Sequence, residues 1–134
     1  MTHRAARTHE QLYAWHTAAV AAGETGGPEI HGDEPQCGWF KCRLSKKGCW
    51  VPARIWVAQV TDADGELTEP AVMHCEVDGD RKDPGERWTW ICSNPITLRE
   101  FEYLTRLRRW QRVNAPHEWD PMRPVDHLST PVLE

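Results

Sequence analysis

The chain has 134 residues, with 40% hydrophobic and 27% charged residues and a formal net charge of -4 at pH 7. This composition is typical of a globular protein, and the length is enough for one domain with its own core but not for two. No apolar run approaches the roughly 20 residues that cross a bilayer, and no apolar segment of a signal peptide follows the basic N-terminus. The sequence therefore predicts a cytoplasmic protein that does not enter a membrane.

Residues 1–36 are predicted to form a helix followed by a flexible linker. Thr8 and Gln11 have the spacing of a capping box, and apolar residues then fall on one side of a helix that Gly23 can end. The stretch after this glycine is rich in Gly, Pro and acidic residues, as linkers are. We therefore expect a detachable N-terminal part, residues 1–36, and a core domain, residues 37–134.

Strand patterns follow, and the clearest is the alternation that places Phe40, Cys42 and Leu44 on one face. Turn signals occur at 45–48 and at the Asp-Gly pair 64–65, and residues 78–86 read as a polar loop. Because consecutive strands joined by short loops usually pair, the sheet should be an antiparallel meander. Four strands are predicted, at Cys37–Leu44, Cys49–Val60, Leu67–Val77 and Arg87–Cys92.

A long helix is predicted near the C-terminus, because Thr97 and Glu100 form a second capping box and the helical pattern runs to about Val113. At about 100° per residue, the helix separates an apolar half from an arginine half. The apolar half holds Phe101, Tyr103, Leu104, Leu107 and Trp110, and the other holds Arg99, Arg106, Arg108, Arg109 and Arg112. The proline-rich remainder reads as an extended tail held by Trp119, Val125 and Leu128.

The fold class that these patterns predict is α+β. It is a four-stranded antiparallel meander packed with one long C-terminal helix, plus an N-terminal helix.

Catalytic and cofactor signatures are weak. The five cysteines are an odd number, which favours buried thiols over disulfides, and their spacing does not match a zinc knuckle. Cys75 follows His74 directly, so on a strand their side chains point to opposite faces. The acidic loops around Asp62 and Asp80 lack the order of a calcium hand. We therefore expect no enzyme, metal or cofactor, although a cysteine and a histidine brought together in space remain the alternative.

The arginine half of the last helix is the best candidate surface, because guanidinium groups bind phosphate or carboxylate at two points and stack on aromatic rings. The alternative is an ordinary solvated face with a Glu102–Arg106 pair. Eight tryptophans are another unusual feature, and Trp and Arg are common interface anchors. The predicted partner-binding residues are Arg99, Arg106, Arg108, Arg109, Arg112, Trp39 and Trp56.

A protein partner is favoured over nucleic acid, which is the second hypothesis. The net charge is -4, and the two acidic loops would repel a long duplex unless they face away from the helix. The sequence does not define the oligomeric state.

Four segments resemble a group of short phage and prophage proteins that has no established activity: GWFKCRL, KKGCWVPARIW, PITLREFEYL and DPMRPVDHL. The resemblance covers roughly Gly38 to the C-terminus, in the same order. It implies a sheet, a helix and a proline-rich tail, and a context in the cytosol of a host bacterium. It also implies a small accessory protein that binds and inhibits a host protein complex, including a defence complex, as anti-CRISPR proteins do.

The first testable prediction concerns the cysteines. Elemental analysis of dialysed protein should find no stoichiometric zinc, because four and six residues separate Cys37, Cys42 and Cys49, whereas zinc ligands are usually two to four residues apart. One equivalent of retained zinc, together with unfolding on chelation, would overturn this prediction.

Overall fold

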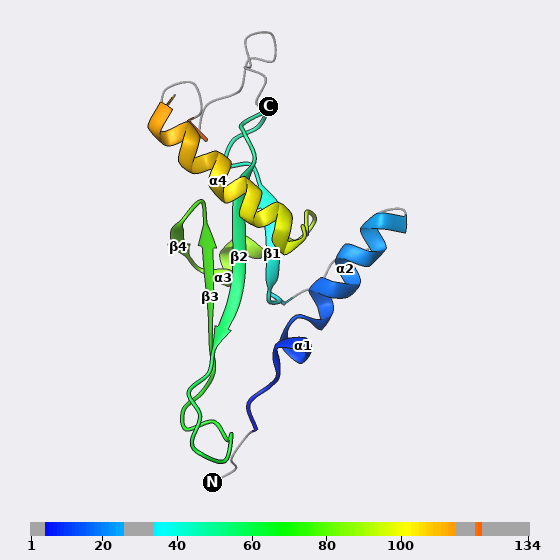
Figure 1. Cartoon of the computed structure of the whole chain (residues 1–134), viewed down its shortest axis with the longest axis vertical. Helices are drawn as coiled ribbons and strands as arrows, with labels where there is room; N and C mark the ends of the chain where they lie inside the picture. The colour runs from blue at the N-terminus through cyan, green and yellow to red at the C-terminus, as the bar shows by residue number, and fades with distance from the viewer. Residues whose placement is uncertain (1–4, 26–33, 115–119, 122–134) are drawn as a thin grey trace.

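The structure is a computed structural model, and it describes residues 5–25, 34–114 and 120–121. Its order is two N-terminal helices, four strands and two further helices (Figure 1). The helices are α1 (His9–Leu12), α2 (Ala14–Thr25), α3 (Pro84–Ile91) and α4 (Leu98–Asn114), and the strands are β1 (Gly38–Cys42), β2 (Val51–Ala58), β3 (Val72–Val77) and β4 (Asp80–Lys82). No helix in these ranges is long and apolar enough to cross a bilayer.

The four strands form one antiparallel sheet in the order β1-β2-β3-β4, so the predicted α+β meander is confirmed. One cross-strand row runs through all four strands: Trp39 pairs with Arg54, Arg54 with Glu76, and Glu76 with Arg81. Helix α4 crosses one face of the sheet and α3 lies behind the other (Figure 1). The sheet is therefore covered on both faces, by helices of very different composition.

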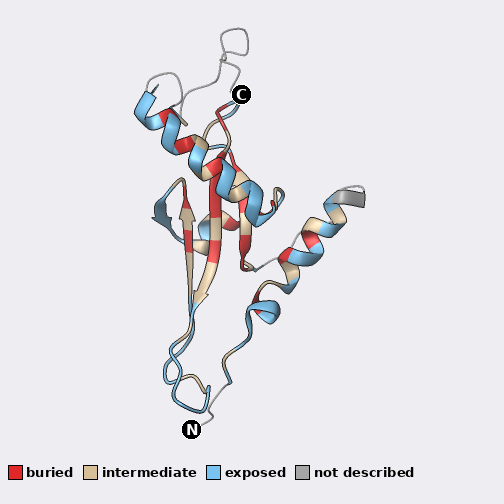
Figure 2. Cartoon of the chain, viewed as in Figure 1, coloured by how far each residue is buried: buried red, intermediate tan, exposed pale blue. Residues whose placement is uncertain are grey.

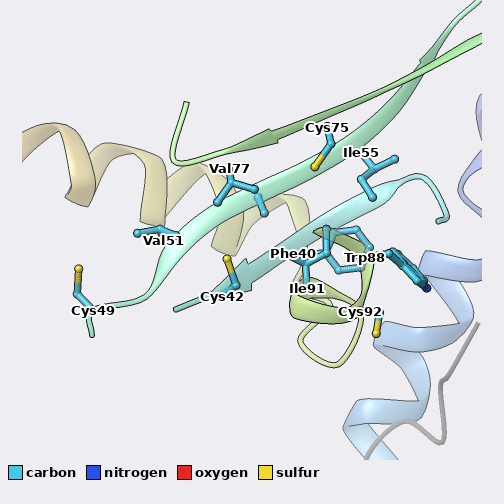
Figure 3. Close-up of a cluster of buried hydrophobic side chains, with 11 residues drawn as sticks. Phe40, Cys42, Cys49, Val51, Ile55, Cys75, Val77, Trp88, Ile91 and Cys92 are labelled. Atoms are coloured by element: carbon cyan, nitrogen blue, oxygen red, sulfur yellow. The ribbon is translucent and has the colours of Figure 1, made fainter. Parts of the chain in front are cut away.

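The hydrophobic core lies between the sheet and α3 (Figure 3). Phe40 of β1 is fully buried there, as the alternation on that strand predicted, and so are Val51 and Ile55 of β2. From α3, Trp88 and Ile91 pack onto these strands, and the Trp88 ring meets Phe40 edge to face at 5.7 Å. Each such buried side chain stabilises the fold by roughly 1.5–3 kcal/mol, so this layer supplies most of the apolar driving force.

The predicted strand Arg87–Cys92 is wrong, because this segment lies mostly in helix α3. Asp83 caps the helix by accepting a hydrogen bond from the Glu86 backbone N–H at 2.9 Å, and Pro84 occupies the first turn. The buried positions Trp88 and Ile91 are three residues apart, as on one face of a helix. The start signal at Asp83 therefore prevails over the strand-like composition that follows it.

The fourth strand is β4 instead, within the stretch that was predicted to be a polar loop. Asp78 and Gly79 connect β3 to β4 with φ values of 52° and 87°. Two successive positive φ angles are typical of a type I′ hairpin turn, which Asp-Gly favours. The Asp-Gly pair at 78–79 thus forms a two-residue hairpin turn between β3 and β4.

The N-terminal helix is divided in two, where one was predicted. The capping box of Thr8 and Gln11 is confirmed, but α1 ends at Leu12, with Tyr13 as its C-cap, and α2 continues past Gly23. The break lies where the Tyr13 ring stacks on Trp39, with ring centroids 4.8 Å apart. This stack fixes the start of α2 beside strand β1.

Helix α2 contacts the core through Trp15 and His16. The Trp15 ring packs on Trp88 at 5.1 Å. His16 is buried, and its Nε2 lies 2.7 Å from the Ile96 carbonyl oxygen and 3.0 Å from that of Trp39. Because both neighbours are acceptors, Nε2 carries the proton. These contacts weigh against a loosely attached helix, but the independent folding of residues 37–134 stays a prediction.

Parts of the predicted linker and tail lie outside the described residues. They include 26–33 of the linker and the positions of Trp119, Val125 and Leu128 in the tail.

His16 makes stability depend on pH, because its burial lowers the pKa and outweighs the two carbonyl hydrogen bonds that raise it. The unfolded chain, with an ordinary histidine pKa of about 6.5, then takes up a proton more readily than the folded chain. The His16 contribution should be full above that pH and be lost as the pH falls toward the folded pKa. Denaturant unfolding at pH 8 and pH 5 measures the difference.

The matched variants are His16→Gln, which keeps an N–H donor without titrating, and His9→Gln at an exposed position. Between pH 8 and pH 5, the free energy of unfolding should fall less for His16→Gln than for the wild type, and it should fall as much for His9→Gln as for the wild type. An equal loss in both variants and the wild type would contradict the assignment.

Candidate functional site

Helix α4 packs on the polar face of the sheet, and its buried stripe differs from the predicted one. The residues that face inward are Leu104, Arg108 and Gln111, which are 7%, 3% and 2% exposed, and Phe101 and Thr105 are half-buried beside them. An arginine and a glutamine thus occupy positions that an apolar stripe would fill. Their presence requires a polar partner on the sheet.

That partner is Asp78, in the turn between β3 and β4. Arg108 donates to its carboxylate at two points, Nε to Oδ1 and Nη2 to Oδ2, both at 3.0 Å. Arg112 contacts the same carboxylate, with Nη2 2.6 Å from Oδ1, and also donates to the Asp78 backbone oxygen. Two-point pairing with a nearly buried carboxylate is the strongest form of this interaction, because both charges are shielded from water.

The rest of the Arg108 guanidinium is also satisfied within the fold. Its Nη1 donates to the Gln111 Oε1 at 2.7 Å and lies 3.7 Å from the Cys49 sulfur. Burial alone would lower the Arg108 pKa, but the hydrogen bond and the charge of Asp78 leave this pKa raised. Arg108 therefore stays charged, and it serves the fold rather than an exposed surface.

The expected division of α4 into an apolar half and an arginine half is corrected by this arrangement. Arg108 lies in the contact with the sheet, and Arg112, although its side chain is 51% exposed, is held by Asp78. Tyr103 and Trp110, which were predicted to lie on the apolar half, are 53% and 42% exposed. The physical reason is that the Asp78 carboxylate sets the rotation of α4 about its axis.

The outward side of α4 consequently combines arginines with aromatic and aliphatic groups. We call this surface the outer face of α4, and Figure 2 shows it as a mostly pale blue side of the helix. Its eight exposed residues are Leu98, Arg99, Glu102, Tyr103, Arg106, Arg109, Trp110 and Val113. At about 100° per residue, they occupy one continuous arc of roughly 140°.

The three arginines of the outer face form no ion pair with another residue in the described part of the chain. The described ion pairs of cations use Lys41, Arg54, Arg81, Arg108 and Arg112, and none uses Arg99, Arg106 or Arg109. The Glu102–Arg106 pair, which belonged to the alternative of an ordinary solvated face, is not among these contacts. The outer face therefore has a local surplus of positive charge beside exposed Tyr103 and Trp110.

Trp39 and Trp56, the other predicted anchors, lie on the polar face of the sheet. Both are half-buried. Tyr13 and His16 pack against the Trp39 ring, and the guanidinium groups of Arg54 and Arg81 lie over Trp56 at 4.2 and 4.7 Å. Neither tryptophan belongs to the outer face of α4, so the structure does not bring the predicted residues into one site.

Hollows between α4 and the sheet add no reactive group. One of about 220 Å³ lies under Phe101 and Arg108, and one of about 400 Å³ lies between Arg112 and Asp120. Asp78, Arg108 and Arg112 line both hollows, and the charges of these three side chains already pair with one another. The described residues contain no group of three or more His, Cys, Asp or Glu side chains suited to a metal.

The cysteines keep the thiol form and form no disulfide. Burial raises the pKa of Cys42 and of Cys75 to about 11, and it also raises the pKa of Cys37 and Cys49. Because the thiolate is the reactive species, these four groups are poor nucleophiles near neutral pH. The acidic loop at 62–66 is an ordinary turn in which Asp62 accepts from the backbone N–H groups of Asp64 and Glu66.

Comparisons with models of protein families, with curated proteins and with solved structures found no match to this chain. The described residues define an α+β protein with a helix that presents arginine, tyrosine and tryptophan on its outward side.

Asp78→Asn tests the salt bridge under α4. Asparagine tolerates the positive φ of this turn and keeps the size of the side chain, so the change removes mainly the charge. Because buried Arg108 then loses its two-point pairing with a charged carboxylate, the free energy of unfolding should fall by about 3 kcal/mol, as when a buried pair is broken. Urea denaturation measures the change.

Arg106→Ala, at an exposed position of the same helix, is the control and should change stability by no more than about 0.5 kcal/mol. A wild-type urea midpoint for Asp78→Asn would mean that the pair does not hold the helix.

Proposed function

We propose that this protein is a non-enzymatic binding protein and that the outer face of α4 is its contact with a protein partner. The observation that carries the proposal is the exposure of Tyr103, Trp110 and Val113, at 53%, 42% and 76%, beside three arginines without ion pairs in the described part of the chain. Tyr, Trp and Arg are the residues that most often anchor protein interfaces.

The cost of leaving such groups exposed supports this function. An aromatic side chain favours burial by roughly 1.5–3 kcal/mol, and four exposed large hydrophobic residues, Leu98, Tyr103, Trp110 and Val113, lie on this one helix. A concentrated patch of this kind marks an interaction surface more often than scattered apolar residues do. Leu104, Arg108 and Gln111 of α4 are buried against the sheet, so the helix is held in position before any partner arrives.

A non-enzymatic role agrees with the state of the reactive side chains. Four of the five thiols have a raised pKa, and the His16 imidazole donates to two backbone carbonyl groups. Neither arrangement resembles an activated nucleophile beside a general base.

Nucleic acid is the second candidate, and Arg99, Arg106 and Arg109 on one face are the observation in its favour. The sequence predicted five arginines on this surface, but Arg108 and Arg112 pair with Asp78. Only three arginines therefore remain available for phosphate groups on this face. Phosphate binding depends on the number of cations that are available, and the chain as a whole carries -4. The protein partner is therefore the better supported alternative.

The nature of the partner is proposed from the resemblance to short phage and prophage proteins. A protein of that kind would act in the host cytosol by binding a host protein complex and inhibiting it, as anti-defence proteins do. The exposed aromatic residues on α4 suit such a role, since they can fill pockets of a larger partner.

The test is affinity capture from nuclease-treated host lysate with the wild type and two variants. Trp110→Ala removes an anchor of the outer face, whereas Trp90→Ala removes a 60% exposed tryptophan of α3 and is the matched control. A specific partner should be retained by Trp90→Ala and lost, at least tenfold, by Trp110→Ala, with both variants melting like the wild type. Equal capture by the two variants would refute the proposal, and DNA binding that Trp110→Ala abolishes would favour the second candidate.

A further inference from the structure

We infer that the partner segment docking on the outer face of α4 is an acidic amphipathic helix. This inference rests on the proposed protein-binding function and specifies the chemistry of the partner. It is carried by the spacing of the outer residues, their surplus of positive charge and the geometry of the helix.

The outer face has the spacing of a helix-packing seam. Tyr103 and Trp110 are seven residues apart, and Arg106 and Val113 lie between and beyond them at intervals of three and four. Residues spaced in this 3-4 pattern form a nearly straight line along a helix, which is the line that a second helix follows when it packs at a crossing angle of about 20°. The aromatic pair is separated by two turns, or roughly 11 Å. An amphipathic helix places apolar residues at the same interval.

The charges of the outer face select an acidic partner. Arg99, Arg106 and Arg109 are opposed within this face by Glu102 alone, and none of the three forms an ion pair with another described residue. Carboxylates beside the apolar anchors of the partner could each accept two hydrogen bonds from one of these guanidinium groups. A basic partner would meet like charges at the centre of the contact, which costs affinity.

The dimensions agree with a helix of ordinary length. Helix α4 has 17 residues, which corresponds to roughly 25 Å. Figure 1 shows α4 lying across the outside of the sheet, with no described helix on its outward side. A partner helix of four to five turns can therefore lie along the whole outer face.

A second copy of this chain fits less well. Antiparallel pairing of two outer faces about their centre would bring Arg106 against Arg106 of the other copy. Each copy contributes three arginines and one glutamate, so the interface would concentrate positive charge without neutralising it.

The experiment uses two synthetic helical peptides of 18 residues with leucine at 3-4 spacing. One has glutamate beside the leucines, the other has lysine at the same positions, and alanine fills the remaining positions in both. Calorimetric titration of each peptide into the full-length protein should show the glutamate peptide binding at least tenfold more tightly. The double variant Arg106→Glu and Arg109→Glu should reverse this preference, because the sign of the face is then inverted.

Controls separate the other occupants. Trp110→Ala should weaken the glutamate peptide at least tenfold, whereas Trp90→Ala should leave its affinity unchanged. The protein alone should sediment as a monomer, since a dimer that Arg106→Glu alters would assign the outer face to a second copy. A single-stranded oligonucleotide that displaces the glutamate peptide and binds more tightly would assign it to nucleic acid.

The outcomes also separate this inference from the proposed function. If Trp110→Ala abolishes partner capture while the protein does not discriminate between the two peptides, the acidic helix is wrong and the protein-binding function stands. If capture is insensitive to Trp110→Ala, both fail. An unchanged peptide preference in the charge-reversed variant refutes the inference even when the glutamate peptide binds.

Discussion

The position of α4 depends on one interaction, the pairing of the Asp78 carboxylate with Arg108. Both groups are nearly buried, at 9% and 3% side-chain exposure, so neither can turn toward water without breaking a two-point pair of buried charges. Fixing Arg108 on the inward side also fixes what faces outward. At about 100° per residue, the positions two residues before and after Arg108, which are Arg106 and Trp110, lie roughly 200° away from it. The exposed arginine and tryptophan of α4 are thus a geometric consequence of the buried pair.

The two faces of the sheet are stabilised by different physics. Against α3, Phe40, Ile55 and Ile91 pack through dispersion and the hydrophobic effect, which do not depend on direction. Against α4, the contact combines Leu104 with charged and amide groups whose hydrogen bonds are directional. An apolar contact would tolerate some rotation of the helix, whereas a two-point arginine–carboxylate pair does not. The polar contact therefore gives up some stability and sets the orientation of the helix more narrowly.

Local patterns predicted those elements that depend on neighbouring residues. The alternation in β1, the capping box at Thr8 and the Thr97 cap of α4, whose Oγ1 accepts from the Glu100 N–H at 3.1 Å, are all present. Helix α3 was missed because Trp, Thr and Ile favour strands, although Asp83 and Pro84 carry a helix start signal. The orientation of α4 was not accessible to the same reasoning, since periodicity counts arginine as an outward residue. The partner of Arg108 lies 30 residues away in the chain, and no local pattern links them.

The structure separates the residues that hold the fold from those on the outer face of α4. Trp39 and Trp56 are large enough to serve as anchors, but each is engaged by neighbours: Tyr13 stacks on the first, and Arg54 and Arg81 lie over the second. Using either ring for a partner would disturb contacts within the sheet. Tyr103 and Trp110 have exposed side chains on a helix that is anchored through its opposite side. Binding there requires little reorganisation of the protein. This favours affinity, because the free energy spent on ordering side chains and loops reduces what a given contact area contributes to binding. This pair is therefore better placed than Trp39 and Trp56 to bind a partner without disturbing the fold.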